Sequence, residues 1–219
     1  MTQGNPELVF AILVPILLAV GVYLLWYSRR RNELMKAFAS SHGLAVHAEL
    51  AAGLEERLTR LFDFDRTMMV RSFGQLKNIV KDGDILIFNG VELLSLTPLT
   101  RSNNPHFARI AALFPTSGKH SGFFNVDKSG AITGRVPGEI RPDENTAQIV
   151  KRTVAEAGAR HSLSATFKGG YGLIYFEPLV TGGENIADLD CLLRLTRLLK
   201  SALGSKADLL LYARLTGMK

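Results

Sequence analysis

The feature that most constrains this chain is an uncharged apolar run near its N-terminus. From Leu8 to Tyr27, twenty consecutive residues, LVFAILVPILLAVGVYLLWY, carry no charged side chain. A helix of that length spans about 30 Å, the hydrocarbon thickness of a bilayer. Pro15 lies inside the run, but membrane helices tolerate proline better than soluble helices do. The run therefore predicts a transmembrane helix over residues 8–28, preceded by a short extracytoplasmic segment over residues 1–7.

Cleaved signal peptides and buried core helices also produce apolar runs. A signal peptide has a basic segment, a shorter apolar stretch and a cleavage site between small residues. Here the preceding sequence, MTQGNPE, contains no Lys or Arg, and WYSRRR marks the end of the run. A core helix is seldom twenty apolar residues long with a basic cluster directly after it. The sequence therefore favours a membrane span over both alternatives.

The residues that flank the run predict its orientation. Tyr and Trp favour the headgroup level, and Lys and Arg beside a span stay on the cytoplasmic side. Glu7 is the only charged residue before Arg29, so all 26 basic residues follow the span. We expect the N-terminus outside, the rest of the chain in the cytoplasm, and the inner membrane's anionic leaflet as a partner that attracts juxtamembrane cations. The residues assigned to anchoring and topology are Trp26, Tyr27, Arg29, Arg30, Arg31 and Lys36.

The rest of the sequence predicts one α+β domain over residues 44–219, joined to the span by a basic helix over residues 29–43. Helical spacing of apolar residues predicts helices within residues 142–158, 184–203 and 51–62, the last with an apolar stripe of Leu54, Leu58, Leu61 and Phe62. Turn residues predict three β-hairpins, around Asp82-Gly83, around residues 127–130 and at Gly169-Gly170. These elements imply an antiparallel sheet packed with helices. HFARIAALF, over residues 106–114, is compatible with either a strand or a helix, so the topology between Ser95 and Arg141 stays open.

A set of residues spread over nearly the whole chain forms a pattern together with the order of these elements: Arg29-Arg30-Arg31, Leu34, Gly43-Leu44, Leu61-Phe62, Asn78, Gly83 with the ILIF run, the GGYGLIYF strand and the ENIADLDCLL helix start. This pattern resembles an uncharacterised family of small bacterial single-pass membrane proteins with a cytoplasmic α+β domain. The resemblance implies a bacterial inner-membrane location, and because no activity is assigned to the family, it implies no catalytic residues.

Two glycine-containing segments invite comparison with phosphate-binding loops. A phosphate loop requires the pattern G-x-x-x-x-G-K-[ST]. The segment FPTSGKHSG around Lys119 lacks the earlier glycine and has His120 where a hydroxyl is needed, so we interpret it as a surface loop. The segment KGGYG, over residues 168–172, lacks the strand-to-helix context of a dinucleotide site and is interpreted as a hairpin turn.

The titratable residues match no catalytic or metal-binding motif. No histidine is spaced from another histidine, or from Cys191, as in a zinc site. We interpret Cys191 as a small core residue of an apolar helix. The close carboxylate pairs, Asp63 with Asp65 and Asp188 with Asp190, are interpreted as solvated side chains, the second pair at a helix start. No catalytic, cofactor-binding or metal-binding residue is assigned. The five histidines are His42, His47, His106, His120 and His161.

Charge and composition narrow the function further. The formal net charge of +6 comes from basic residues that are scattered beyond Arg31, so no nucleic-acid partner is expected. The single cysteine cannot form an internal disulfide, in keeping with a reducing compartment. We therefore expect a non-enzymatic membrane-anchored accessory or scaffold protein with protein partners, acting as a subunit of an inner-membrane complex. The alternative is a membrane-tethered enzyme or small-ligand sensor, which requires a cleft lined by converging polar groups.

Overall fold

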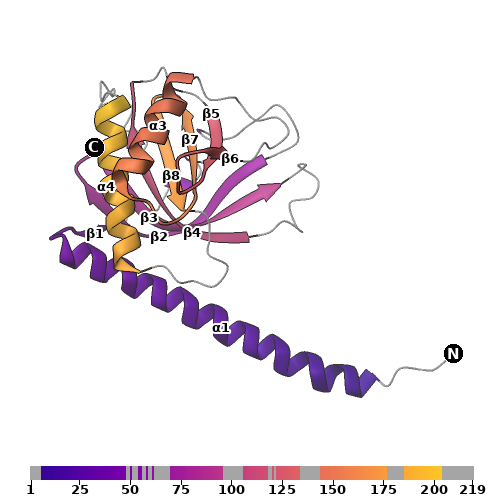
Figure 1. Ribbon diagram of the computed structural model, residues 1–219. Helices are drawn as coiled ribbons and strands as arrows, with labels where there is room; N and C mark the ends of the chain where they lie inside the picture. Colours follow the sequence, from indigo (N-terminus) through magenta and orange to yellow (C-terminus); the bar gives the residue numbers. More distant parts are fainter. Residues whose placement is uncertain are drawn as a thin grey trace.

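The chain forms a long N-terminal helix followed by an α+β domain (Figure 1). The computed structural model describes residues 6–47, 50, 54–55, 58, 61, 70–95, 106–117, 120, 122–133, 144–176 and 185–203. The helices are α1 (Pro6–Ser41), α3 (Glu144–Ala157) and α4 (Ile186–Leu203). The strands are β1 (Val46–His47), β2 (Val70–Asp82), β3 (Ile85–Ser95), β4 (His106–Pro115), β5 (Gly122–Val126), β6 (Ile132–Thr133), β7 (Leu163–Lys168) and β8 (Tyr171–Phe176).

The strands form one open sheet in the order β1-β2-β3-β4-β8-β7-β5-β6, and every neighbouring pair is antiparallel. The expected α+β class and antiparallel sheet are therefore confirmed. The ambiguous segment HFARIAALF lies in strand β4, between β3 and β8. This central position explains the ambiguity, because a strand covered on both faces has no alternation of apolar and polar residues.

The turn between β2 and β3 differs from the expectation by one residue. Asp82 pairs with Ile85, so the two loop residues are Gly83 and Asp84 rather than Asp82 and Gly83. Gly83 has a φ of +60°, whereas Asp84 has no positive φ. A positive φ at the first loop position alone is typical of a type II′ turn, which places glycine at that position.

Helix α1 passes through two different environments. From Ala11 to Val20 every side chain is exposed, and in Figure 1 this half projects away from the sheet. The second half buries Arg31, Met35 and Phe38, at i, i+4 and i+7, against the domain. The helix is continuous from Pro6 to Ser41, so the expected span and juxtamembrane helix are one element. Its segment Ala11–Ser41 is long and apolar enough to cross a membrane.

Apolar side chains are buried on both faces of the sheet. On one face, Ile85, Ile87 and Ile110 belong to a core that also includes residues of α1, α3 and α4. On the other face, Leu86 and Phe88 pack in a second core with Leu54 and Leu58. The helical stripe expected over residues 51–62 is confirmed at Leu54 and Leu58, while Phe62 lies outside the described residues. The sheet is thus the middle layer of the domain.

Candidate functional site

The first turn of α4 is held by reciprocal hydrogen bonds between Asn185 and Asp188. The backbone N–H of Asp188 donates to Oδ1 of Asn185 over 3.1 Å, and the backbone N–H of Asn185 donates to Oδ2 of Asp188 over 3.1 Å. This is the capping-box arrangement, with aspartate as the acid that reaches back. It gives the Asn185 N–H an acceptor, and it gives the Asp188 N–H a second acceptor beside the carbonyl oxygen of Asn185, to which that N–H also donates over 3.1 Å.

Each acid in this turn also has a histidine partner. His161, just before β7, lies with its Nε2 3.0 Å from Oδ1 of Asp188. His42, just after α1, lies with its Nε2 2.7 Å from Oδ1 of Asp190. Asp188 is buried, so its interpretation as a solvated side chain is wrong, and Asp190 is exposed but paired. The start of α4 therefore joins the end of α1 to the loop before β7.

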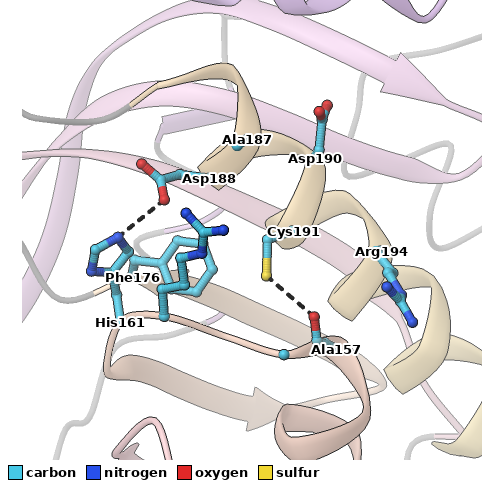
Figure 2. Close-up of a pocket in the computed structure, with 10 residues that line it drawn as sticks. Ala157, His161, Phe176, Ala187, Asp188, Asp190, Cys191 and Arg194 are labelled. Carbon is cyan, nitrogen blue, oxygen red and sulfur yellow. Dashed lines mark hydrogen bonds and ion pairs between the residues drawn. The ribbon is translucent and has the colours of Figure 1, made fainter.

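A pocket of about 250 Å³ opens beside this turn (Figure 2). The end of α3 and the loop after it form one side, and the first turns of α4 form the other. Phe176 adds an aromatic face, which packs edge-on against His161 with ring centroids 5.8 Å apart. The lining residues are Ala157, Gly158, Arg160, His161, Phe176, Ala187, Asp188, Asp190, Cys191 and Arg194.

Cys191 contributes a protonated thiol to this pocket. Burial raises the pKa of the Cys191 thiol, the charge of Asp188 raises it further, and the charges of Arg194 and Arg160 partly oppose this. Its Sγ lies 3.8 Å from the carbonyl oxygen of Ala157, where the thiol donates a weak hydrogen bond (Figure 2). A nucleophilic cysteine requires a lowered pKa. Cys191 was expected to be a small core residue, but it is only partly buried: it packs against the core from the pocket wall.

Two guanidinium groups at this pocket have no ionic partner among the residues that the structure describes. Arg160 and Arg194 both have exposed side chains, and within the described part of the chain neither forms an ion pair. One Nη of Arg194 donates to the carbonyl oxygen of Glu156 over 3.3 Å. Two basic residues further along α4 differ, because Arg197 pairs with Asp82 over 2.8 Å and Lys200 pairs with Asp84.

The residues assigned to anchoring and topology lie along one stretch of α1. Arg30 lies over the ring of Trp26, and Arg31 over the ring of Tyr27, each with 5.5 Å from its guanidinium carbon to the ring centroid. Arg29, Arg30 and Lys36 are exposed, whereas Arg31 is buried. The three arginines thus differ in environment: Arg31 belongs to the packed face of α1.

His120 corrects the interpretation of FPTSGKHSG as a surface loop. It is buried, with Nδ1 2.7 Å from Oγ1 of Thr146, at the start of α3. Its Nε2 lies 3.2 Å from the carbonyl oxygen of Leu203, at the end of α4. His120 therefore links the ends of two helices, while Lys119 lies outside the described residues, as do Asp63 and Asp65.

Sequence reasoning missed the pocket because its residues come from separate segments. Asn185 and Asp188 form a recognisable capping pair, but nothing in the local sequence links His161 to Asp188 or Arg160 to Arg194. Among the described residues, no group of three or more His, Cys, Asp and Glu side chains is arranged to hold a metal ion. Comparison of the chain with protein-family models, curated proteins and solved structures finds no match. The resemblance to a bacterial membrane-protein family stays a prediction.

Proposed function

We propose that this protein is a single-pass inner-membrane protein that presents its α+β domain in the cytoplasm as a non-enzymatic accessory or scaffold subunit. The observation that carries the proposal is the change of environment along α1. Between Ile12 and Trp26 the large apolar side chains that the structure describes, all but Leu24, are exposed, and beyond Arg31 one face of the same helix is buried in the domain. Leaving a large apolar side chain in water costs about 1.5–3 kcal/mol relative to burying it. A lipid environment around the first half removes that cost.

The order of residues at the exit from the apolar segment supports the proposed orientation. Tyr23, Trp26 and Tyr27 form a cluster in which Tyr23 and Tyr27 stack with ring centroids 6.2 Å apart. Arg29 and Arg30 follow directly and are exposed. Aromatic residues at the headgroup level with arginines beyond them favour a cytoplasmic domain.

The junction between α1 and the domain supports a scaffold role. The helix enters the domain without a linker, and its buried face includes Met35, Phe38 and Ala39. The Asn32 and His42 side chains hydrogen-bond to Asn78 of β2 and Asp190 of α4. A domain held in this way keeps one orientation relative to the bilayer, which suits a surface that meets a partner in the same membrane.

Fractionation and topology mapping test the anchoring. Full-length protein in bacterial membranes is expected to resist carbonate extraction, and protease added to right-side-out spheroplasts should leave the domain intact. Purification in mild detergent should then recover a stoichiometric partner. Recovery in the soluble fraction, cleavage of the domain from outside, or a strictly monomeric protein that turns over a substrate would each contradict the proposal.

The pocket favours a second candidate function, a membrane-tethered small-ligand sensor. Binding sites combine apolar walls with a few converging polar groups. The pocket has both, since Phe176 and two alanines accompany the polar side chains at the start of α4. Asp190 lines the pocket and is also hydrogen-bonded to His42 after α1, so an occupant would contact a residue joined to the membrane helix. Specific binding of a small molecule that depends on pocket residues tests this candidate.

A further inference from the structure

The charged groups of the pocket differ in how many partners they have. Asp188 accepts hydrogen bonds from His161 and from the backbone of Asn185, and Asp190 accepts one from His42. Both carboxylates are therefore already bound by groups of this chain. An incoming cation would have to compete with these partners.

The two guanidinium groups retain most of their hydrogen-bonding capacity. Each guanidinium has five N–H donors. Arg160 forms no hydrogen bond or ion pair within the described residues, and Arg194 uses one Nη on the carbonyl oxygen of Glu156. By contrast, Arg152 on neighbouring α3 is paired with Glu156 over 2.8 Å. Among the described residues, the two arginines of the pocket therefore keep N–H groups without an acceptor, whereas its two carboxylates already accept hydrogen bonds from this chain.

Both positive charges act on the interior of the pocket. Although burial and Asp188 raise the pKa of the Cys191 thiol, Arg194 and Arg160 act to lower it, so both charges lie within electrostatic reach of Sγ. Cys191 lies on α4 at the pocket wall, with its Sγ directed toward Ala157 at the end of α3 (Figure 2). A negatively charged group placed beside Cys191 would be attracted by both arginines and repelled by Asp188, whose carboxylate is already hydrogen-bonded to His161 and to the backbone of Asn185.

From this charge distribution we infer that the pocket binds a small organic oxyanion, a phosphomonoester or short carboxylate, between Arg160 and Arg194. The planar guanidinium matches the oxygen spacing of both anions, which favours paired hydrogen bonds. The volume of about 250 Å³ lies below the roughly 300–1,000 Å³ of drug-sized sites, so the ligand is small. Phe176 and the two alanines fit its apolar part.

The position of the pocket favours a soluble ligand over a lipid headgroup. Asp190, which lines the pocket, is hydrogen-bonded to His42 just after the end of α1. The helix continues for about 18 Å from Arg29 to its end at Ser41, so the pocket lies near the end of α1 that is farther from the apolar segment. If Arg29 marks the headgroup level, the pocket lies beyond the reach of a phosphate in the bilayer. The inference rests on the second candidate function, the pocket as a ligand site, and not on membrane attachment itself.

Calorimetry on the full-length protein in a neutral detergent tests this inference, with phenyl phosphate and benzoate as anionic probes and benzyltrimethylammonium as a cationic probe. The anions are expected to bind and the cation is not. Arg160→Gln and Arg194→Gln should each weaken binding by about tenfold, because each removes charge-assisted hydrogen bonds. Arg152→Gln, which removes an exposed guanidinium nearby on α3, is the matched control and should leave binding unchanged.

Several outcomes overturn the inference. Absence of anion binding at millimolar concentration, or equal binding by the wild type and the double arginine variant, would remove the oxyanion site. Binding of the ammonium probe instead would retain a ligand pocket but reject the anion class. If phosphatidylglycerol vesicles displaced phenyl phosphate and phosphatidylcholine vesicles did not, the ligand would be a lipid headgroup and not a soluble oxyanion. Membrane fractionation is independent of all these measurements, so failure of the anchoring proposal is distinguishable from failure of this one.

Discussion

The side-chain amide of Asn78 in β2 donates a hydrogen bond to the side-chain oxygen of Asn32 in α1 over 2.6 Å. Asn78 has a φ of +49°, the only positive φ of a non-glycine residue in the described part of the chain. It lies at an irregularity in the pairing of β2 with β3, between Lys77 and Val80. Such bulges redirect a side chain, and asparagine tolerates the left-handed conformation better than most residues. The bulge therefore directs a polar side chain of the sheet to the N-terminal helix.

Substitutions at these two positions separate the hydrogen bond from the backbone conformation. Asn78→Gly keeps a positive φ but loses the amide, so the free energy of unfolding should fall by about 1 kcal/mol. Asn78→Ala should cost about a further 1 kcal/mol, because alanine is strained in the left-handed region. Denaturant unfolding of full-length protein in detergent, followed by circular dichroism, measures both changes.

Asn32→Ala supplies the control for this pair. If the hydrogen bond is the shared cause, the effects of Asn32→Ala and Asn78→Gly should not add in the double variant. Full additivity would show that the two side chains stabilise the protein separately.

A charge in the exposed apolar half of α1 should prevent membrane integration. Leu17 is 60% exposed in a stretch without charged residues. An arginine at the centre of a span costs about 2.5–3.5 kcal/mol for insertion. Leu17→Arg is therefore expected to move a large fraction of the protein into the carbonate-soluble or aggregated fractions. Ser40→Arg, exposed on the domain half of the same helix, should remain in the membrane; equal behaviour of the two variants would argue against a span.

The Cys191 thiol should react slowly with iodoacetamide at neutral pH. Its pKa is raised by burial and by Asp188, so the thiolate that reacts forms only at higher pH than in an unstructured peptide. Asp188→Asn should lower the pKa and speed alkylation, whereas Arg194→Gln should raise the pKa and slow it. Because Cys191 is the only cysteine, mass spectrometry of the intact chain reports its rate directly. A rate equal to that of a free cysteine peptide, unaffected by either variant, would contradict the described environment.

The sequence predicts the elements better than it predicts the contacts between them. The apolar run, the Leu54 and Leu58 stripe and the antiparallel sheet follow local patterns, and each is present in the structure. Strand β4 was ambiguous because burial on both faces removes the alternation that identifies strands. The β2–β3 turn shifted by one residue because glycine accepts either loop position, and the pairing of Asp82 with Ile85 decides between them.

The pocket and the buried polar contacts are results of tertiary structure. His161 and Asp188 are 27 residues apart, and His120 and Leu203 are 83 apart. No spacing rule relates residues so distant in the sequence. Surface and buried histidines also look alike in one sequence, which is why the position of His120 was not foreseen.

The loop between β5 and β6 should make the stability of the domain sensitive to acid. Oδ1 of Asp127 accepts hydrogen bonds from the Ser129 hydroxyl and from the backbone N–H groups of Ser129 and Ala131, at 2.6, 2.8 and 2.9 Å. The Ser129 hydroxyl in particular lowers the pKa of Asp127 below its ordinary value of 3.8. A carboxyl whose pKa is lower in the folded state stabilises the fold above its ordinary pKa and loses that effect as pH falls through the lowered pKa.

Asp127→Asn should therefore be less stable than the wild type near neutral pH, because the amide oxygen accepts these hydrogen bonds less strongly than a carboxylate. The gap in unfolding midpoint should begin to narrow as pH falls below about 3.8, the ordinary pKa, and should be smallest once pH has fallen through the lowered pKa, where the folded wild-type carboxyl is protonated as well. Lys128→Gln, an exposed change in the same loop, serves as the control and should show a gap that does not narrow on acidification. If the wild type kept the same lead in unfolding midpoint over Asp127→Asn down to the lowest pH at which the protein folds, the charge of Asp127 would not contribute to the stability of the loop.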